Sequence, residues 1–197
     1  MRSIASIKLI KPHKLPESAV GLTLLAAALL PGCRHLGPAV ERDGRDSLAL
    51  ASPDLRDGRF PGAFTCDGAN ASPALRWNAP PAGTKSLALI LNDRSAPMGS
   101  FVHWVLYDLP PETTSLPASV PASDQLPNGA RQGRNDFDKI GYGGPCPSGH
   151  AEHRYVFLLF ALDAKLNLPA GATRAQLDDA MKGHVLARGV LTAGFSR

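Results

Sequence analysis

Side chains able to hold an anion or transfer a proton lie at or near the ends of apolar runs. Asp93 follows one such run, His103 lies within a second, and His153 and Tyr155 stand at the start of a third. Imidazole and phenol groups donate hydrogen bonds, and a carboxylate accepts them. These side chains are therefore suited to binding a small tetrahedral oxyanion. Asp93 would orient an imidazole or accept a hydrogen bond from an ammonium group.

A glycine-rich loop, Gly143–Gly149 (GGPCPSG), precedes His150 and His153. Successive backbone amides in such a loop can form a nest for an anion. We expect these amides to converge with the carboxylate, the imidazoles and the phenol.

The same residues also have structural interpretations. His103 within a strand is more often a satisfied core histidine, and Asp93 can be a turn residue. A metal site built on His103, His150 and His153 lacks the closed Cys/His spacing typical of such centres, so no metal is expected.

A catalytic nucleophile is difficult to identify. Neither Gly-x-Ser-x-Gly nor His-Glu-x-x-His occurs. A hydrolase using Cys146 or Ser148 with His150 or His153 is the weaker alternative, and a disulfide would remove Cys146 from it. We therefore expect a protein that is not an enzyme.

The elements that must position these residues are short and rich in β-formers. Apolar runs bounded by Pro and Gly signals predict strands over Ser86–Asn92, Phe101–Asp108 and Tyr155–Asp163. Their near-continuous apolarity indicates that both faces are covered, as in a sandwich core or a sheet flanked by helices.

One helix is predicted near the C-terminus. Thr173-Arg174-Ala175-Gln176 has the form of a capping box. An apolar stripe follows at four-residue spacing, at Leu177, Met181 and Val185. Gly189 predicts the end of the helix, and Val190–Phe195 a last short strand.

The charge is concentrated at the N-terminus. The 197-residue chain has a net charge of +4, but residues 1–32 hold four of its 21 basic residues and one of its 17 acidic ones. The remainder is close to neutral, so no nucleic acid partner is expected.

The basic start and the uncharged run Ala19–Leu30 predict a signal peptide over residues 1–32. Leu30-Pro31-Gly32-Cys33 resembles a bacterial lipobox, although Pro31 is unusual there, and predicts lipidation of Cys33. Residues 33–46 then form a linker and residues 47–197 the folded domain. Cleavage without lipidation and a buried core helix are the alternatives. We expect an exported, periplasmic or cell-envelope protein.

Two further cysteines, Cys66 and Cys146, are left if Cys33 carries lipid. They can form a disulfide in an oxidising compartment, or remain as two separate buried thiols. The spacing alone does not choose between these states.

Several motifs together resemble one family. They occur in this order: Asp93-Arg94-Ser95-Ala96-Pro97, Val102-His103-Trp104, Tyr142-Gly143-Gly144-Pro145-Cys146-Pro147 and His153-Arg154-Tyr155. Residues 47–197 resemble the phosphatidylethanolamine-binding protein family, in its bacterial YbhB/YbcL, Raf kinase inhibitor-like branch.

The resemblance implies a mostly β fold, an antiparallel β-sandwich with a C-terminal helix and short peripheral helices. It also implies a pocket for a phosphate-like anion or a phospholipid head group, without a cofactor. The residues that match the family's pocket are Asp93, His103, Gly144, Pro145, His153 and Tyr155. Arg94 and Ser95 replace a Pro and an Asp of the family's acidic segment, which predicts undiminished anion binding but weaker selectivity for an ammonium-bearing head group.

Three functions follow as hypotheses. The first is an exported binding protein, attached to a membrane through its lipid. The second is an inhibitor of a kinase or protease that acts through protein contacts, and the third is the hydrolase described above. A homodimer is left open.

Overall fold

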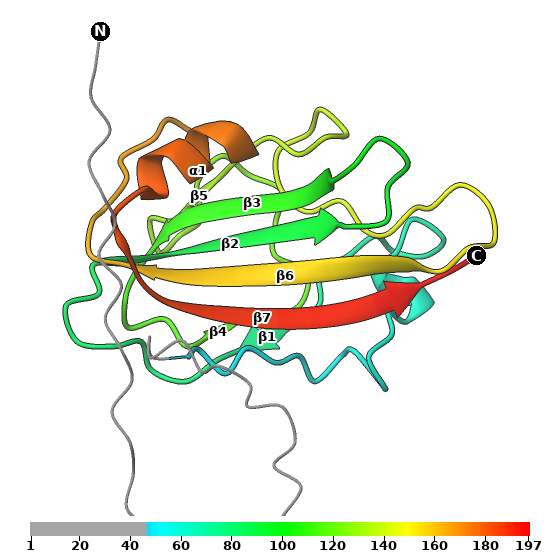
Figure 1. Cartoon of the computed structure of the whole chain (residues 1–197), viewed down its shortest axis with the longest axis horizontal. Coiled ribbons are helices and arrows are strands. Elements are labelled where there is room, and N and C mark those ends of the chain that lie inside the picture. The colour runs from blue at the N-terminus through cyan, green and yellow to red at the C-terminus, as the bar shows by residue number, and fades with distance from the viewer. Residues whose placement is uncertain (1–46) are drawn as a thin grey trace, which may run out of the picture. The chain divides into compact units, whose positions relative to one another are not determined.

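The computed structural model describes residues 47–197, in which strands greatly outnumber helices (Figure 1). The predicted signal peptide, the predicted linker and Cys33 lie outside the described residues. The elements are η1 (Gly62–Phe64), β1 (Leu75–Arg76), β2 (Ser86–Asp93), β3 (Phe101–Leu109), β4 (Ser115–Leu116), β5 (Arg131–Gln132), β6 (His153–Leu162), α1 (Arg174–Met181) and β7 (Val185–Phe195). Within residues 47–197, no helix has the length and apolarity needed to cross a membrane.

A five-stranded sheet in the order β5-β3-β2-β6-β7 dominates the fold, and all of its neighbouring strands are antiparallel. The three strands expected from the apolar runs are confirmed, with bounds shifted by one or two residues. All eight residues of β2 are buried, because this strand is central in the sheet and covered on both faces.

The sheet separates two apolar clusters. On one face, Leu87 and Leu89 of β2 pack in a cluster with Leu75 of β1 and Leu116 of β4, which form a second, two-stranded sheet. On the other face, Ile90 belongs to a cluster completed by α1. The antiparallel sandwich with one C-terminal helix is thus confirmed, and η1 is the short peripheral helix.

Helix α1 begins as expected but ends earlier. The Gln176 amide donates to Thr173 Oγ1 at 3.3 Å, and the Thr173 amide donates to Gln176 Oε1 at 2.8 Å, which completes the capping box. Gly183, with φ +80°, follows the helix, and Val185 already belongs to β7. The prediction that Val185 extends the helical stripe was therefore wrong.

The predicted stop at Gly189 was also wrong, because Gly189 lies inside β7. A Cβ there would press against the Leu48 carbonyl oxygen and lie 3.0 Å from the Leu48 Cβ. Glycine at this position therefore permits the close approach of the N-terminal segment to the sheet. In the same region Ser47 forms a parallel bridge with Arg188, so the described chain joins the sheet beside this part of β7.

Candidate functional site

The antiparallel register brings the predicted site residues to one end of the sheet. Asp93 is the last residue of β2 and pairs with Tyr155, near the start of β6. His103 lies near the start of β3, next to Val102, which pairs with Asn92. In Figure 1 these strand ends share the end of the sheet where the chain's C-terminus lies, whereas α1 lies toward the opposite end.

Asp93 and His153 form a buried pair. His153 Nδ1 lies 2.6 Å from Asp93 Oδ2, and their exposed fractions are 8% and 4%. The other carboxylate oxygen, Oδ1, accepts from the amide of Ser95 at 2.8 Å. Asp93 thus contacts an imidazole, as expected from the sequence, and each of its oxygens already accepts one hydrogen bond.

Among the described residues, the buried hydroxyl of Tyr155 makes no hydrogen bond of ordinary distance and angle, although Asp93 and the Cys146 backbone lie close enough to act on it. Burial and, next, the charge of Asp93 raise the pKa of Tyr155. The phenol therefore keeps its proton across the physiological range. Because an unpaired buried hydroxyl costs free energy, it stands out as a group suited to a ligand.

His103 is oriented by a backbone carbonyl. Its Nδ1 lies 2.7 Å from the Gly143 oxygen, and because a carbonyl only accepts, Nδ1 must carry the hydrogen. Burial lowers the pKa of His103, which favours the neutral ring. The aromatic rings of Phe101, Phe137 and Tyr155 surround it edge-on, each with its centroid 5.2 Å away.

Two amides of the glycine-rich loop already donate to groups within the protein. The Gly143 amide donates to the His103 carbonyl at 2.9 Å, and the Gly144 amide donates to Asn70 Oδ1 at 2.7 Å. Pro145 has no amide hydrogen, and its carbonyl accepts from the Cys66 amide at 3.1 Å. The amides of Gly143 and Gly144 are therefore used inside the protein, while ligand binding by this loop, including Gly144 and Pro145, stays a prediction.

The two glycines serve close packing instead. A Cβ on Gly143 would lie 2.6 Å from the Phe137 ring. A Cβ on Gly144 would lie 2.7 Å from Asn70 Oδ1. These glycines allow the loop to lie directly against Phe137 and Asn70, neither of which was among the predicted site residues.

A disulfide joins Cys66 to Cys146, with the Cα atoms 5.4 Å apart. Of the two states that the sequence left open, the structure therefore has the cross-link. It attaches the segment after η1 to the glycine-rich loop Gly143–Gly149, called the pocket loop below, next to the hydrogen bond between Cys66 and Pro145. In this form Cys146 has no thiolate for nucleophilic chemistry.

The remaining candidates, His150 and Ser148, are exposed, unlike the buried cluster of Asp93, His103, His153 and Tyr155. His150 Nδ1 lies 3.1 Å from the Arg197 carbonyl oxygen. Among residues 47–197, no group of three or more His, Cys, Asp or Glu side chains is arranged to hold a metal ion.

Two hollows flank the cluster. One, of about 510 Å³, is lined by Arg94–Pro97, Gly99 and Ser100 in the loop after Asp93. The other, of about 240 Å³, is lined by Gly143 and Gly144 together with Phe137, Tyr142 and the disulfide. None of Asp93, His103, His153 and Tyr155 lines either hollow.

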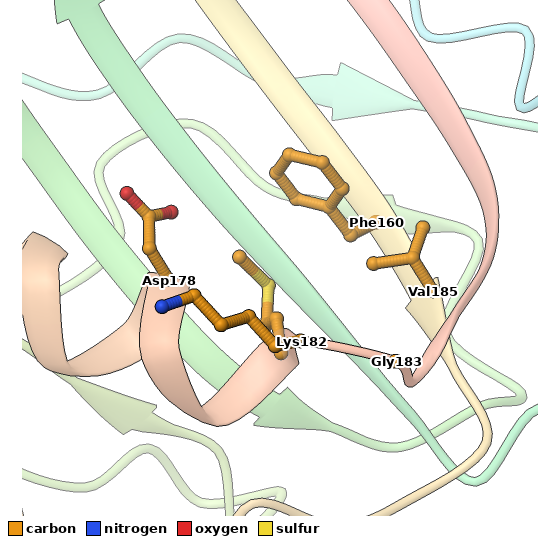
Figure 2. A pocket seen from close by; sticks show the side chains of 6 residues that line it. Phe160, Asp178, Lys182, Gly183 and Val185 are labelled. Carbon is orange, nitrogen blue, oxygen red and sulfur yellow. The ribbon is translucent and has the colours of Figure 1, made fainter.

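A separate hollow of about 460 Å³ lies at the end of α1. Figure 2 shows Asp178 and Lys182 on the helix side and Phe160 and Val185 on the strand side. None of the residues predicted to bind a ligand lines this hollow.

The comparison with family models decides the family. The model of the phosphatidylethanolamine-binding protein family matches residues 52–196, which include every strand and the whole buried cluster. The chain belongs to this family. YbhB of Escherichia coli is 39% identical to the chain over 158 residues, covering 76% of the chain and all of YbhB.

Two other relatives support the same placement. The crystal structure of E. coli YbcL, titled a new member of the mammalian family, superposes with a TM-score of 0.71 and 29% identity over 77% of this chain and 99% of YbcL. "Putative lipoprotein LppC" of Mycobacterium tuberculosis is 35% identical over 188 residues, covering 86% of this chain and 90% of LppC. The predicted YbhB/YbcL branch is confirmed.

Proposed function

We propose that this phosphatidylethanolamine-binding protein relative binds a small phosphate-like anion at the cluster of Asp93, His103, His153 and Tyr155. The observation that carries the proposal is the buried Tyr155 hydroxyl, which has no partner among residues 47–197. An anionic oxygen would accept its hydrogen bond and remove the cost of leaving it unpaired.

His153 supplies the second contact. Its Nδ1 is engaged by Asp93, so its Nε2 is the ring atom that can face a ligand. In the doubly protonated imidazole, Nε2 donates a hydrogen bond as Nδ1 does. The rings of His153 and Tyr155 are stacked, with centroids 6.4 Å apart and planes inclined by 25°, so both polar atoms can serve one ligand.

We propose binding rather than catalysis. Cys146 is in the disulfide, and Ser148 is exposed and makes no hydrogen bond to a histidine in the described part of the chain. Neither arrangement resembles an activated nucleophile next to its base. Inhibition through protein contacts and homodimer formation stay predictions.

Export with a lipid on Cys33 is part of the same proposal. The basic and apolar leader supports it, and so does the name of LppC. A disulfide that encloses a long loop is typical of proteins in oxidising compartments. Mass spectrometry of membrane fractions would detect a diacylglyceryl group on Cys33, and Cys33→Ala should release the protein.

Calorimetric titration of the intact chain with phosphate and phosphoethanolamine tests the binding site. We expect saturable binding, and a loss of about tenfold or more in affinity for His153→Ala. His184→Ala is the matched control, because His184 also pairs with a carboxylate, Asp163 at 2.8 Å, but is exposed and away from the site. Binding that is absent, or equally strong in both variants, would refute the proposed site.

A further inference from the structure

The hydrogen on His103 is assigned by geometry, and this decides what His103 can offer a ligand. With the hydrogen on Nδ1 donated to the Gly143 carbonyl, the neutral ring presents a lone pair at Nε2. Nε2 makes no hydrogen bond within residues 47–197. His103 is therefore a hydrogen-bond acceptor toward a ligand, and not the donor that an anion site would suggest.

The rest of the cluster does not favour a fully ionised ligand. Asp93 is a buried carboxylate in the same cluster, and it repels negative charge. Tyr155 contributes a hydroxyl, and His153 contributes a donor only when it is protonated. A dianion without hydrogens would meet an unpaired lone pair and a like charge at close range.

The titratable groups around His103 come from several elements. Asp93 of β2 and Asp136 of the loop after β5 act on its pKa through their charge, and Tyr155 and His153 stand on β6. Both carboxylates favour protonation of His103, but burial outweighs them and lowers its pKa. The acceptor state is thus maintained at neutral pH.

We propose that the site selects a tetrahedral anion that carries its own hydrogen, namely the singly protonated form of a phosphomonoester. Its P–OH donates to His103 Nε2, while an anionic oxygen accepts from Tyr155 and from His153. This inference rests on the proposed function and defines the ligand class of that same site. A phosphodiester, as in an intact phospholipid head group, has no such hydrogen.

Two matched probes test the inference on the unaltered chain. Methyl phosphate as its monoanion and methyl sulfate have the same charge and nearly the same shape, but only the phosphate has an O–H group that can donate a hydrogen bond. At pH 5 we expect methyl phosphate to bind about tenfold or more tightly than methyl sulfate. Because the second pKa of a phosphomonoester is about 6, its affinity should fall about 100-fold between pH 5 and pH 8.

Other outcomes separate this inference from the proposed function. If methyl sulfate or glycerophosphoethanolamine, a phosphodiester, binds as tightly as methyl phosphate at pH 5, the site binds anions but the inference is wrong. The same holds if methyl phosphate binds equally at pH 5 and pH 8. If none of the probes binds at either pH, the proposed function itself fails.

A variant adds an independent test. His103→Phe keeps an aromatic ring among Phe101, Phe137 and Tyr155 but removes the lone pair. The preference for methyl phosphate over methyl sulfate should disappear in it, and should persist in the control His184→Phe. A preference that survives in folded His103→Phe would overturn the assignment. If this variant does not fold, the comparison of methyl phosphate with methyl sulfate on the unaltered chain still decides whether the inference is correct.

Discussion

The amide of Cys66 donates to the carbonyl oxygen of Pro145, beside the disulfide that joins Cys66 to Cys146. Two segments 80 residues apart in sequence are thereby joined by a covalent bond and a hydrogen bond at the same place. The pocket loop, which contains Gly143 and orients His103, is therefore attached to the segment after η1.

Removal of this cross-link should lower stability and loosen the loop. For a closed loop of this length, the chain-entropy model predicts a loss of about 4 kcal/mol in the free energy of unfolding. Urea denaturation of Cys66→Ser/Cys146→Ser measures it. Adding reductant should destabilise the unaltered protein but not the double variant. Equal midpoints for the oxidised protein and the variant would contradict the prediction.

Asn92 is buried with no hydrogen-bond partner for either polar atom of its side-chain amide among the described residues. Asn92→Leu should therefore raise the free energy of unfolding by about 1 kcal/mol, because an unpaired amide is replaced by an apolar group of similar size. Asn135 is the matched control. It is equally buried, but its Nδ2 donates to the Gly141 carbonyl at 2.9 Å and its Oδ1 accepts from the Phe137 amide at 3.0 Å.

Asn135→Leu should destabilise the protein by about 2 kcal/mol, since it leaves those backbone groups unpaired. Thermal melts of both variants, confirmed by urea denaturation, provide the comparison. Destabilisation of similar size in the two variants would show that Asn92 is paired after all.

Tyr155→Phe should change stability and binding in opposite directions. Loss of an unpaired buried hydroxyl should stabilise the free protein by about 1 kcal/mol, while loss of the donor should weaken phosphate binding about tenfold. Denaturation without ligand and calorimetry with phosphate measure the two effects. A variant that is both less stable and unimpaired in binding would argue that the hydroxyl has a structural role.

Stability should fall on mild acidification because of His103. Its pKa is lowered in the folded protein from the ordinary value of 6.5, so the unfolded chain takes up the proton first. The loss therefore begins as the pH falls below about 6.5, and stability attributable to His103 is fully present above it. Urea denaturation between pH 5 and pH 7.5 should show a smaller loss in His103→Phe than in the unaltered protein. Parallel profiles would assign the loss to other groups.

The sequence was sufficient where local patterns determine structure. Three long strands followed from apolar runs bounded by turns, and the start of α1 followed from the Thr173–Gln176 capping box. The two-residue strands β1, β4 and β5 have too few residues to give a pattern. Gly189 was assigned to the end of a helix because its actual contact, Leu48, is distant in sequence.

The candidate site was likewise predictable only in part. Asp93, His103, His153 and Tyr155 stand at strand ends that the antiparallel register brings together. The amide of Gly144 was expected to be free, because nothing local reveals that Asn70 accepts its hydrogen bond. Phe101 lies two residues before His103, so the predicted strand already placed the two side chains on one face, whereas Phe137 reaches the His103 ring only through the fold.

The bridge between Ser47 and Arg188 fixes where the described domain begins relative to the cluster. Along β7, Arg188 and Phe195, the partner of His153, are seven residues apart, about 23 Å in a strand. Whatever precedes residue 47 is therefore attached at the end of the sheet remote from the cluster. Truncation up to this residue should consequently leave the contacts among Asp93, His153 and Tyr155 unchanged.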